Sequence, residues 1–225
     1  MKIVAASDSS LLVEFGRLIA PELHERVLAL FRALLAQRDP RIRNLHPGYA
    51  SLLIDFDPLR LTHVHLATDV RELMDLEPAQ KEAPARTITI PVCYDAEFGP
   101  DLADVAAYNH ISPDEVIRLH TSATYLVYFL GFTPGFAYLG GLADELRTPR
   151  LATPRSRVPA GSVGIAGDQT GIYPMDSPGG WRLIGRTPVQ MFDAIADPPS
   201  RLQPGDSVKF TAVRRSSFDE IARSH

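Results

Sequence analysis

The sequence predicts an α+β protein of two domains: a small N-terminal α/β sandwich over residues 1–80 and a β-rich domain over residues 81–225. Three observations predict this division. Residues 1–80 alternate short apolar runs with helical periodicity, and residues 77–84 lose all periodicity and contain two prolines. Between residues 131 and 190 lie 11 of the 15 glycines, a density that indicates many tight turns joining short strands.

The N-terminal elements follow from local patterns. Apolar runs predict strands at residues 3–5 and 11–15, on either side of a polar turn. Apolar positions at i, i+4, i+7 and i+8 predict a helix over residues 21–37 that begins at Pro21, where the missing N–H costs nothing. A strand at 51–56 and a helix at 62–76 complete two strand–helix passages, which is typical of a sandwich.

Residues 77–84 are the expected linker, and the second domain begins after them with a strand at 87–93. Two helices follow, and Ser112 and Glu115 form a capping box at the start of the second one. The remaining expected elements are strands. They cover residues 125–131, 162–166, 171–173 and, as a closing strand, 207–213. The C-terminal part is therefore expected to be a β-barrel or a sandwich.

Composition excludes several classes of protein. A net charge of −4 and a pI near 6.0 argue against nucleic-acid partners and against an anionic membrane surface. The single cysteine, Cys93, excludes an internal disulfide and a cysteine metal cluster, and its apolar context predicts a buried thiol. The sequence shows no signal peptide, no apolar run of membrane-spanning length and no metal-ligand set, so a cytoplasmic protein is expected.

The glycine-rich loops also concentrate aromatic and arginine side chains. Guanidinium groups, backbone N–H groups and aromatic walls suit the binding of a carboxylate, a phosphate or a planar amide. The predicted substrate-binding residues are Phe132, Phe136, Tyr138, Arg155, Gln169, Tyr173, Trp181 and Arg186. The alternative is that the arginines pair with Asp144, Asp168 or Asp176 and only stiffen the turns.

Motifs that identify an enzyme are absent from the sequence. No lysine follows a glycine-rich turn, which excludes a P-loop, and Ser162 lies one residue short of a nucleophile elbow. The catalytic residues stay unknown, with two candidates. His120 ends a helix, where its protonated form is favoured, and Asp168 could act as a base in its loop. A structural role is as well supported for both of them.

The loop motifs nevertheless resemble one family closely. The segments GFTPGFAYLGGL (131–142), TPRLATPRSRVPAGSVGIAGDQTGIYP (148–174) and SPGGWRLIGRTP (177–188) occur in order, after HTSATYLVYF from His120. They resemble the family of B-type subunits of 5-oxoprolinase, which is also known as the KipI or allophanate hydrolase subunit 1 family. The resemblance is strongest from about residue 88 to residue 213 and is weaker before it.

The resemblance implies a C-terminal cyclophilin-like β-barrel and a subunit of an ATP-dependent 5-oxoprolinase that opens 5-oxo-L-proline to L-glutamate. It implies subunits A and C as partners, a small amide or lactam substrate, and ATP shared with the partner subunits. Two alternatives stay open: a KipI-type inhibitor of a sensor histidine kinase, and a subunit of a carboxyltransferase of the urea carboxylase or allophanate type. Because a lactam carbonyl is a poor electrophile, we expect phosphorylation of its oxygen to activate it, with arginines and loop N–H groups neutralising the charge.

Overall fold

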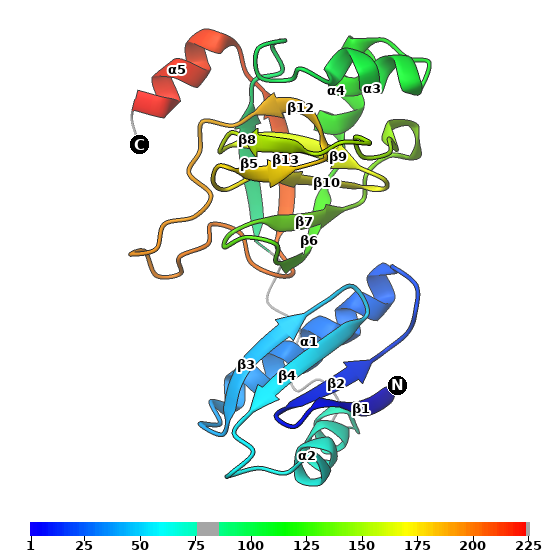
Figure 1. Cartoon of the computed structure of the whole chain (residues 1–225), viewed down its shortest axis with the longest axis vertical. Helices are drawn as coiled ribbons and strands as arrows, with labels where there is room; N and C mark the ends of the chain where they lie inside the picture. The colour runs from blue at the N-terminus through cyan, green and yellow to red at the C-terminus, as the bar shows by residue number, and fades with distance from the viewer. Residues whose placement is uncertain (76–85, 224–225) are drawn as a thin grey trace. The chain divides into compact units, whose positions relative to one another are not determined.

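The structure is a computed structural model that describes residues 1–75 and 86–223. It divides into two compact units, Met1–Pro84 and Ala85–His225. The expected linker at residues 77–84 lies outside the described residues. Each unit is described on its own below (Figure 1).

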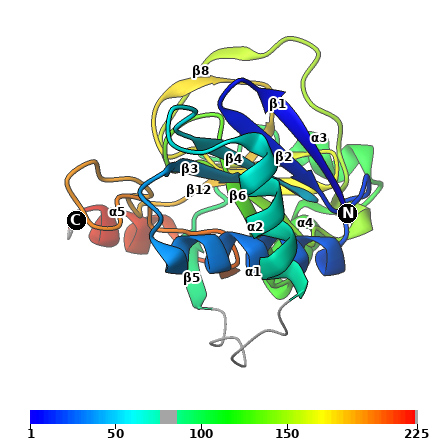
Figure 2. The same cartoon turned by 90° about the horizontal axis from the view of Figure 1, so that it is seen from below.

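The first unit is a four-stranded antiparallel sheet in the order β1-β2-β4-β3, with two helices packed on one face. Its elements are β1 (Lys2–Ser7), β2 (Ser10–Glu14), α1 (Pro21–Gln37), β3 (Ile42–Pro47), β4 (Ser51–Phe56) and α2 (His63–Asp75). Burial alternates along β2 and β4, so that Leu11, Val13, Leu52, Ile54 and Phe56 point toward the helices. Figure 2 shows α1 and α2 on the same side of these strands.

The predicted elements of the first unit are confirmed, and one strand is added to them. The helix expected at 21–37 is α1 with the same bounds, and Pro21 lies in its first turn. Strand β3 was not predicted, because Arg43, Asn44 and His46 are polar and exposed and so leave no apolar run in the sequence. Pairing with β4 along its whole length makes this segment a strand.

The second unit is a seven-stranded sheet in the order β12-β9-β10-β7-β6-β13-β5. Its strands are β5 (Thr87–Val92), β6 (Tyr125–Leu130), β7 (Ala137–Gly140), β9 (Ser162–Ala166), β10 (Gln169–Ile172), β12 (Arg182–Arg186) and β13 (Ser207–Ala212). A separate ribbon pairs β8 (Arg155–Val158) with β11 (Ser177–Gly179). The β-rich character expected after residue 86 is confirmed.

One pair of backbone hydrogen bonds joins the two ends of this sheet. The N–H of Cys93 donates to the carbonyl of Arg186, and the N–H of Arg186 donates to the carbonyl of Cys93, both at 2.9 Å. The sheet is thereby nearly closed into a barrel. The segment expected to close it, residues 207–213, forms β13 instead, which lies inside the sheet between β6 and a parallel β5. Local composition specified a strand there but not its neighbours.

Helices pack against the strands of the second unit and contribute to its hydrophobic core. The two expected helices are α3 (Leu102–Tyr108) and α4 (Pro113–Ser122), which lie together in Figure 1. The predicted cap is confirmed, since the backbone N–H of Glu115 donates to the Ser112 hydroxyl at 3.1 Å. The short helices η1 (Asp144–Leu146) and α5 (Arg215–Arg223) were not predicted. In α5, Phe218 alone is buried, which is too little for a recognisable period.

Candidate functional site

Five of the predicted site residues form one aromatic cluster in the second unit: Phe132, Phe136, Tyr138, Tyr173 and Trp181. The Phe136 ring lies at its centre, with centroids 5.0 Å from Tyr138, 5.2 Å from Tyr173 and 5.3 Å from Trp181. All three pairs are edge-to-face, the arrangement that aromatic quadrupoles favour. The structure thus brings together aromatic residues from two separate segments of the chain, residues 132–138 and 173–181.

The turn between β6 and β7 decides which rings are exposed. Phe132 has φ 69° and Gly135 has φ 82°, and the N–H of Gly131 donates to the carbonyl of Phe136 at 3.1 Å. This tight turn leaves the Phe132 side chain 61% exposed and buries Phe136 to 1%. Phe132 is therefore the most exposed ring of the cluster and the first that a ligand would contact.

A close approach by Tyr173 requires the glycine at position 179. A Cβ on Gly179 would lie 2.3 Å from the Tyr173 hydroxyl oxygen, so any larger residue would displace that hydroxyl. Burial raises the pKa values of both Tyr173 and Tyr138, while the charge of Arg150 acts in the opposite direction on each. Both phenols are consequently neutral near pH 7. Tyr138 is partly buried and can donate a hydrogen bond to a ligand, whereas Tyr173 is only 1% exposed and belongs to the packing of the cluster.

The two predicted arginines have partners within the chain. The Arg155 Nη2 donates to Asp101 Oδ1 at 2.7 Å, and Asp101 Oδ2 also accepts from the Leu183 N–H at 2.7 Å. Arg186 donates from Nε to the carbonyl of Ala160 at 2.7 Å. Pairing partners were expected at Asp144, Asp168 or Asp176, but Arg155 uses Asp101, which sequence reasoning missed. Its only signal was its place directly before α3.

His120 is buried, and this corrects the expectation that its protonated form is favoured. Its Nδ1 lies 2.7 Å from the Tyr94 hydroxyl and its Nε2 lies 3.0 Å from Thr170 Oγ1, whose own hydrogen is donated to the carbonyl of Gly164. The Thr170 oxygen must then accept from Nε2–H, which leaves Nδ1 to accept from Tyr94. Burial lowers the pKa of His120 to about 3, because desolvation outweighs the effect of the helix terminus.

Asp168 is not among the residues that form the aromatic cluster. Asp168 is exposed in the turn between β9 and β10. It lines a shallow pocket of about 410 Å³ with Tyr108, Arg147 and Thr148. Gln169 is buried at the start of β10. The structure therefore does not bring His120, Asp168 and the aromatic rings into one constellation.

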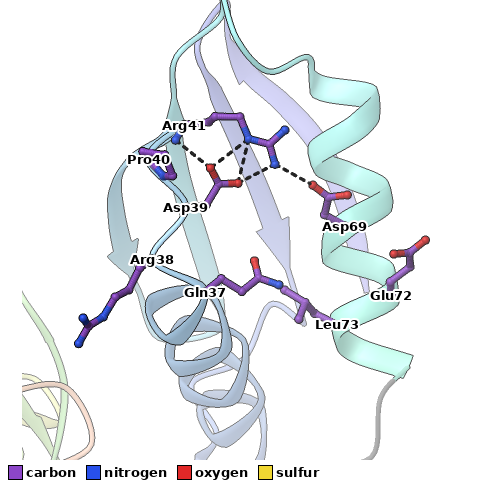
Figure 3. Close-up of a pocket in the computed structure, with 8 residues that line it drawn as sticks. All are labelled: Gln37, Arg38, Asp39, Pro40, Arg41, Asp69, Glu72 and Leu73. Atoms are coloured by element: carbon purple, nitrogen blue, oxygen red, sulfur yellow. Dashed lines mark hydrogen bonds and ion pairs between the residues drawn. The ribbon is translucent and has the colours of Figure 1, made fainter.

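Figure 3 shows a second pocket, of about 460 Å³, in the first unit. Arg41 donates to both oxygens of Asp39 and lies 3.9 Å from Asp69 of α2. Hydrogen bonds from Arg41 hold the pKa of Asp39 below its usual range. Sequence reasoning missed this pocket, which forms where the end of α1 meets α2. Asp39, Arg41 and Asp69 are paired with one another, and the other charged residues that line the pocket are Arg38 and Glu72.

Two further findings concern metal sites and membrane-spanning helices among the described residues. Nowhere in residues 1–75 and 86–223 do three histidine, cysteine, aspartate or glutamate side chains gather as a metal site would require. Over the same ranges, no helix combines the length and apolarity needed to cross a membrane. The expected burial of Cys93 is confirmed, and burial raises the pKa of its thiol.

Comparisons with known proteins point to one family. The profile of the carboxyltransferase domain, subdomain C and D, matches residues 1–202. The B-type subunit of 5-oxoprolinase from Bacillus subtilis (strain 168) is 40% identical over 96% of this chain and 95% of its own length. The B-type subunit of 5-oxoprolinase from Haemophilus influenzae is 41% identical over 93% of this chain and 97% of its own length.

Other matches are to larger proteins. The crystal structure of TTHA0988 superposes with a TM-score of 0.81 at 40% identity over 91% of this chain, which spans only 40% of that protein. A urea amidolyase of Saccharomyces cerevisiae is 26% identical over 96% of this chain, which covers 13% of the enzyme. These matches show that the same arrangement also occurs as one part of longer chains.

Proposed function

Because this chain belongs to the family of B-type subunits of 5-oxoprolinase, we propose that it is one subunit of an ATP-dependent 5-oxoprolinase that opens 5-oxo-L-proline to L-glutamate. The observation that carries the proposal is identity of 40% and 41% with two such subunits over nearly their whole lengths. The urea amidolyase match, at 26% identity, supports the carboxyltransferase alternative more weakly. We also propose that the two units are separate domains, the second a cyclophilin-like barrel, in a cytoplasmic protein.

We propose that the aromatic cluster forms part of the substrate site and that subunits A and C supply the rest. The cluster offers an exposed ring, Phe132, and one partly exposed neutral phenol, Tyr138, which suit a flat lactam. It offers no nucleophile with an adjacent base, because His120 is enclosed in its own hydrogen-bond network. The activating base therefore belongs to a partner in this proposal.

ATP fits the described residues of this chain poorly. A triphosphate needs several cations or a row of backbone N–H groups, and the sequence has no P-loop. The guanidinium groups of Arg155, Arg157 and Arg182 are already paired with carboxylates. We accordingly propose that the phosphates of ATP are held mainly by another subunit.

The test is reconstitution. The purified chain is combined with subunits A and C, and ATP-dependent formation of glutamate from 5-oxo-L-proline is measured. We expect turnover from the complete mixture, and little or none from this chain alone or from the mixture that omits it. Equal turnover without this chain, or turnover by the chain alone at the rate of the complex, would contradict the proposal.

The roles predicted for Arg155 and Arg186 are tested in the same complex. If either one binds substrate, Arg→Lys lowers kcat/KM with an unchanged melting temperature, since Lys cannot reproduce bidentate geometry. If their contacts with Asp101 and Ala160 only stiffen the fold, the melting temperature falls and kcat/KM is unchanged.

A further inference from the structure

Arg150 differs from the other arginines of the glycine-rich region. Six arginines lie between residues 131 and 190. Arg147, Arg155, Arg157 and Arg182 pair with carboxylates, and Arg186 donates to a backbone carbonyl. Within the described part of the chain, Arg150 makes no hydrogen bond or ion pair.

The unpaired guanidinium of Arg150 lies beside the aromatic cluster. Its Cζ is 5.9 Å from the centroid of the Trp181 ring, within cation–π range. Its charge also acts on the hydroxyl groups of both Tyr138 and Tyr173, which places it near the phenols of the cluster, of which Tyr138 is partly exposed. An aromatic contact orients a guanidinium without using its N–H groups, so all five remain available.

We propose that Arg150 binds the carboxylate of a small, ring-bearing substrate whose flat face contacts the aromatic cluster. The inference rests on the proposed function and deepens it, because 5-oxo-L-proline is a lactam ring that carries one carboxylate. The site then selects for the anion through Arg150 and for the ring through the exposed aromatic surface. Arg155 and Arg186 contribute to the shape of the site through their own partners.

The charge balance favours a monoanion over a polyphosphate. The neighbouring arginines, Arg155 and Arg182, are neutralised by Asp101 and Asp104, so a single uncompensated positive charge is left at the cluster. One guanidinium matches one carboxylate in a bidentate pair, whereas the several charges of a nucleotide would stay largely unpaired. Carboxylate and phosphate are nevertheless both anions that an arginine can bind, so the experiment includes both.

Trp181 is the single tryptophan of the chain, and its fluorescence therefore reports on this site directly. The full-length chain is titrated with 5-oxo-L-proline, with its uncharged carboxamide and with ADP. We expect a saturable change in Trp181 fluorescence with 5-oxo-L-proline. The carboxamide should bind at least about tenfold more weakly, which is the loss in affinity typical of removing a charge-assisted hydrogen bond. ADP is expected to bind no more tightly than 5-oxo-L-proline.

The variants are Arg150→Gln, Arg150→Lys and the control Arg118→Gln, which removes an exposed arginine paired with Glu115 on α4. Arg150→Gln should weaken 5-oxo-L-proline binding at least about tenfold and Arg150→Lys by less, since Lys keeps the charge but loses the bidentate geometry. The control should bind as the wild type does. The melting temperature should be unchanged in both Arg150 variants, because the side chain makes no bond that folding needs.

Three results would overturn the inference: no response to 5-oxo-L-proline, equal affinity in the Arg150→Gln variant, or Arg150-dependent binding that is tighter for ADP. Its failure can be distinguished from failure of the proposed function by assaying the same variants in the complex with subunits A and C. Turnover with an unchanged KM in Arg150→Gln would refute the carboxylate site and leave the function standing. Arg150-dependent carboxylate binding in a complex that never forms glutamate would support the carboxylate site and refute the proposed function.

Discussion

Acid should destabilise the second unit through His120. The loss of unfolding free energy follows from the burial of this side chain, which lowers its pKa. In the folded chain the pKa of His120 is lowered to about 3, against an ordinary 6.5 after unfolding. Between these values the unfolded chain binds a proton that the folded chain excludes. The stabilisation is therefore complete above about pH 6.5 and is lost as the pH falls toward 3.

The magnitude comes from proton linkage, which gives about 1.4 kcal/mol for each pH unit in this window. Between about pH 7.5 and about pH 5, His120 should therefore contribute a loss of about 2 kcal/mol. His120→Gln removes the titration but keeps a donor and an acceptor. It should itself cost about 1–3 kcal/mol near neutral pH, because the Tyr94 and Thr170 hydroxyls lose well-placed partners.

The assay is urea unfolding of the wild type and of His120→Gln, followed by Trp181 fluorescence, which reports on the second unit. Other titrating groups are common to both proteins, so the difference in their unfolding free energies isolates His120. That difference should narrow by about 2 kcal/mol as the pH falls from about 7.5 to about 5. A difference that does not change with pH would show that His120 takes up a proton in the folded state, as a catalytic acid would.

Two further changes test the packing around the site. Asp101→Asn should lower the unfolding free energy by about 2 kcal/mol, because it leaves the partly buried guanidinium of Arg155 without its counter-charge; an unchanged urea midpoint would contradict this. Gly99→Ala should cost about 1–3 kcal/mol, since its Cβ would lie 2.2 Å from the carbonyl oxygen of Ile184. The matched control is Gly180→Ala, where the nearest atom is 3.6 Å away, and equal melting temperatures for the two variants would refute the argument.

Local sequence signals predicted most of the secondary structure correctly. The helix that begins at Pro21 and the N-cap at Ser112 depend on residues within one or two turns of each other, and both are confirmed, although the Glu115 carboxylate pairs with Arg118 and does not complete the capping box. The glycine-rich loops also indicated that Phe136, Tyr173 and Trp181 act together, and the structure packs them into one cluster. Strand β3 was not predicted because Arg43, Asn44 and His46 are polar and break both an apolar run and a strict alternation, and pairing with β4 defines it.

Only the tertiary structure decided which charges were free and which histidine was enclosed. Arg155 and Asp101 are 54 residues apart, and His120 and Thr170 are 50 apart, so no local pattern could predict either contact. The closure of the barrel at Cys93 and Arg186 is equally non-local. Composition and spacing by themselves were enough to predict most helices and strands, the loops that hold the aromatic residues, and the family resemblance. Which arginine of residues 131–190 is left without a hydrogen bond or ion pair depends on how the chain brings distant carboxylates to its neighbours, and among the described residues of that region it is Arg150.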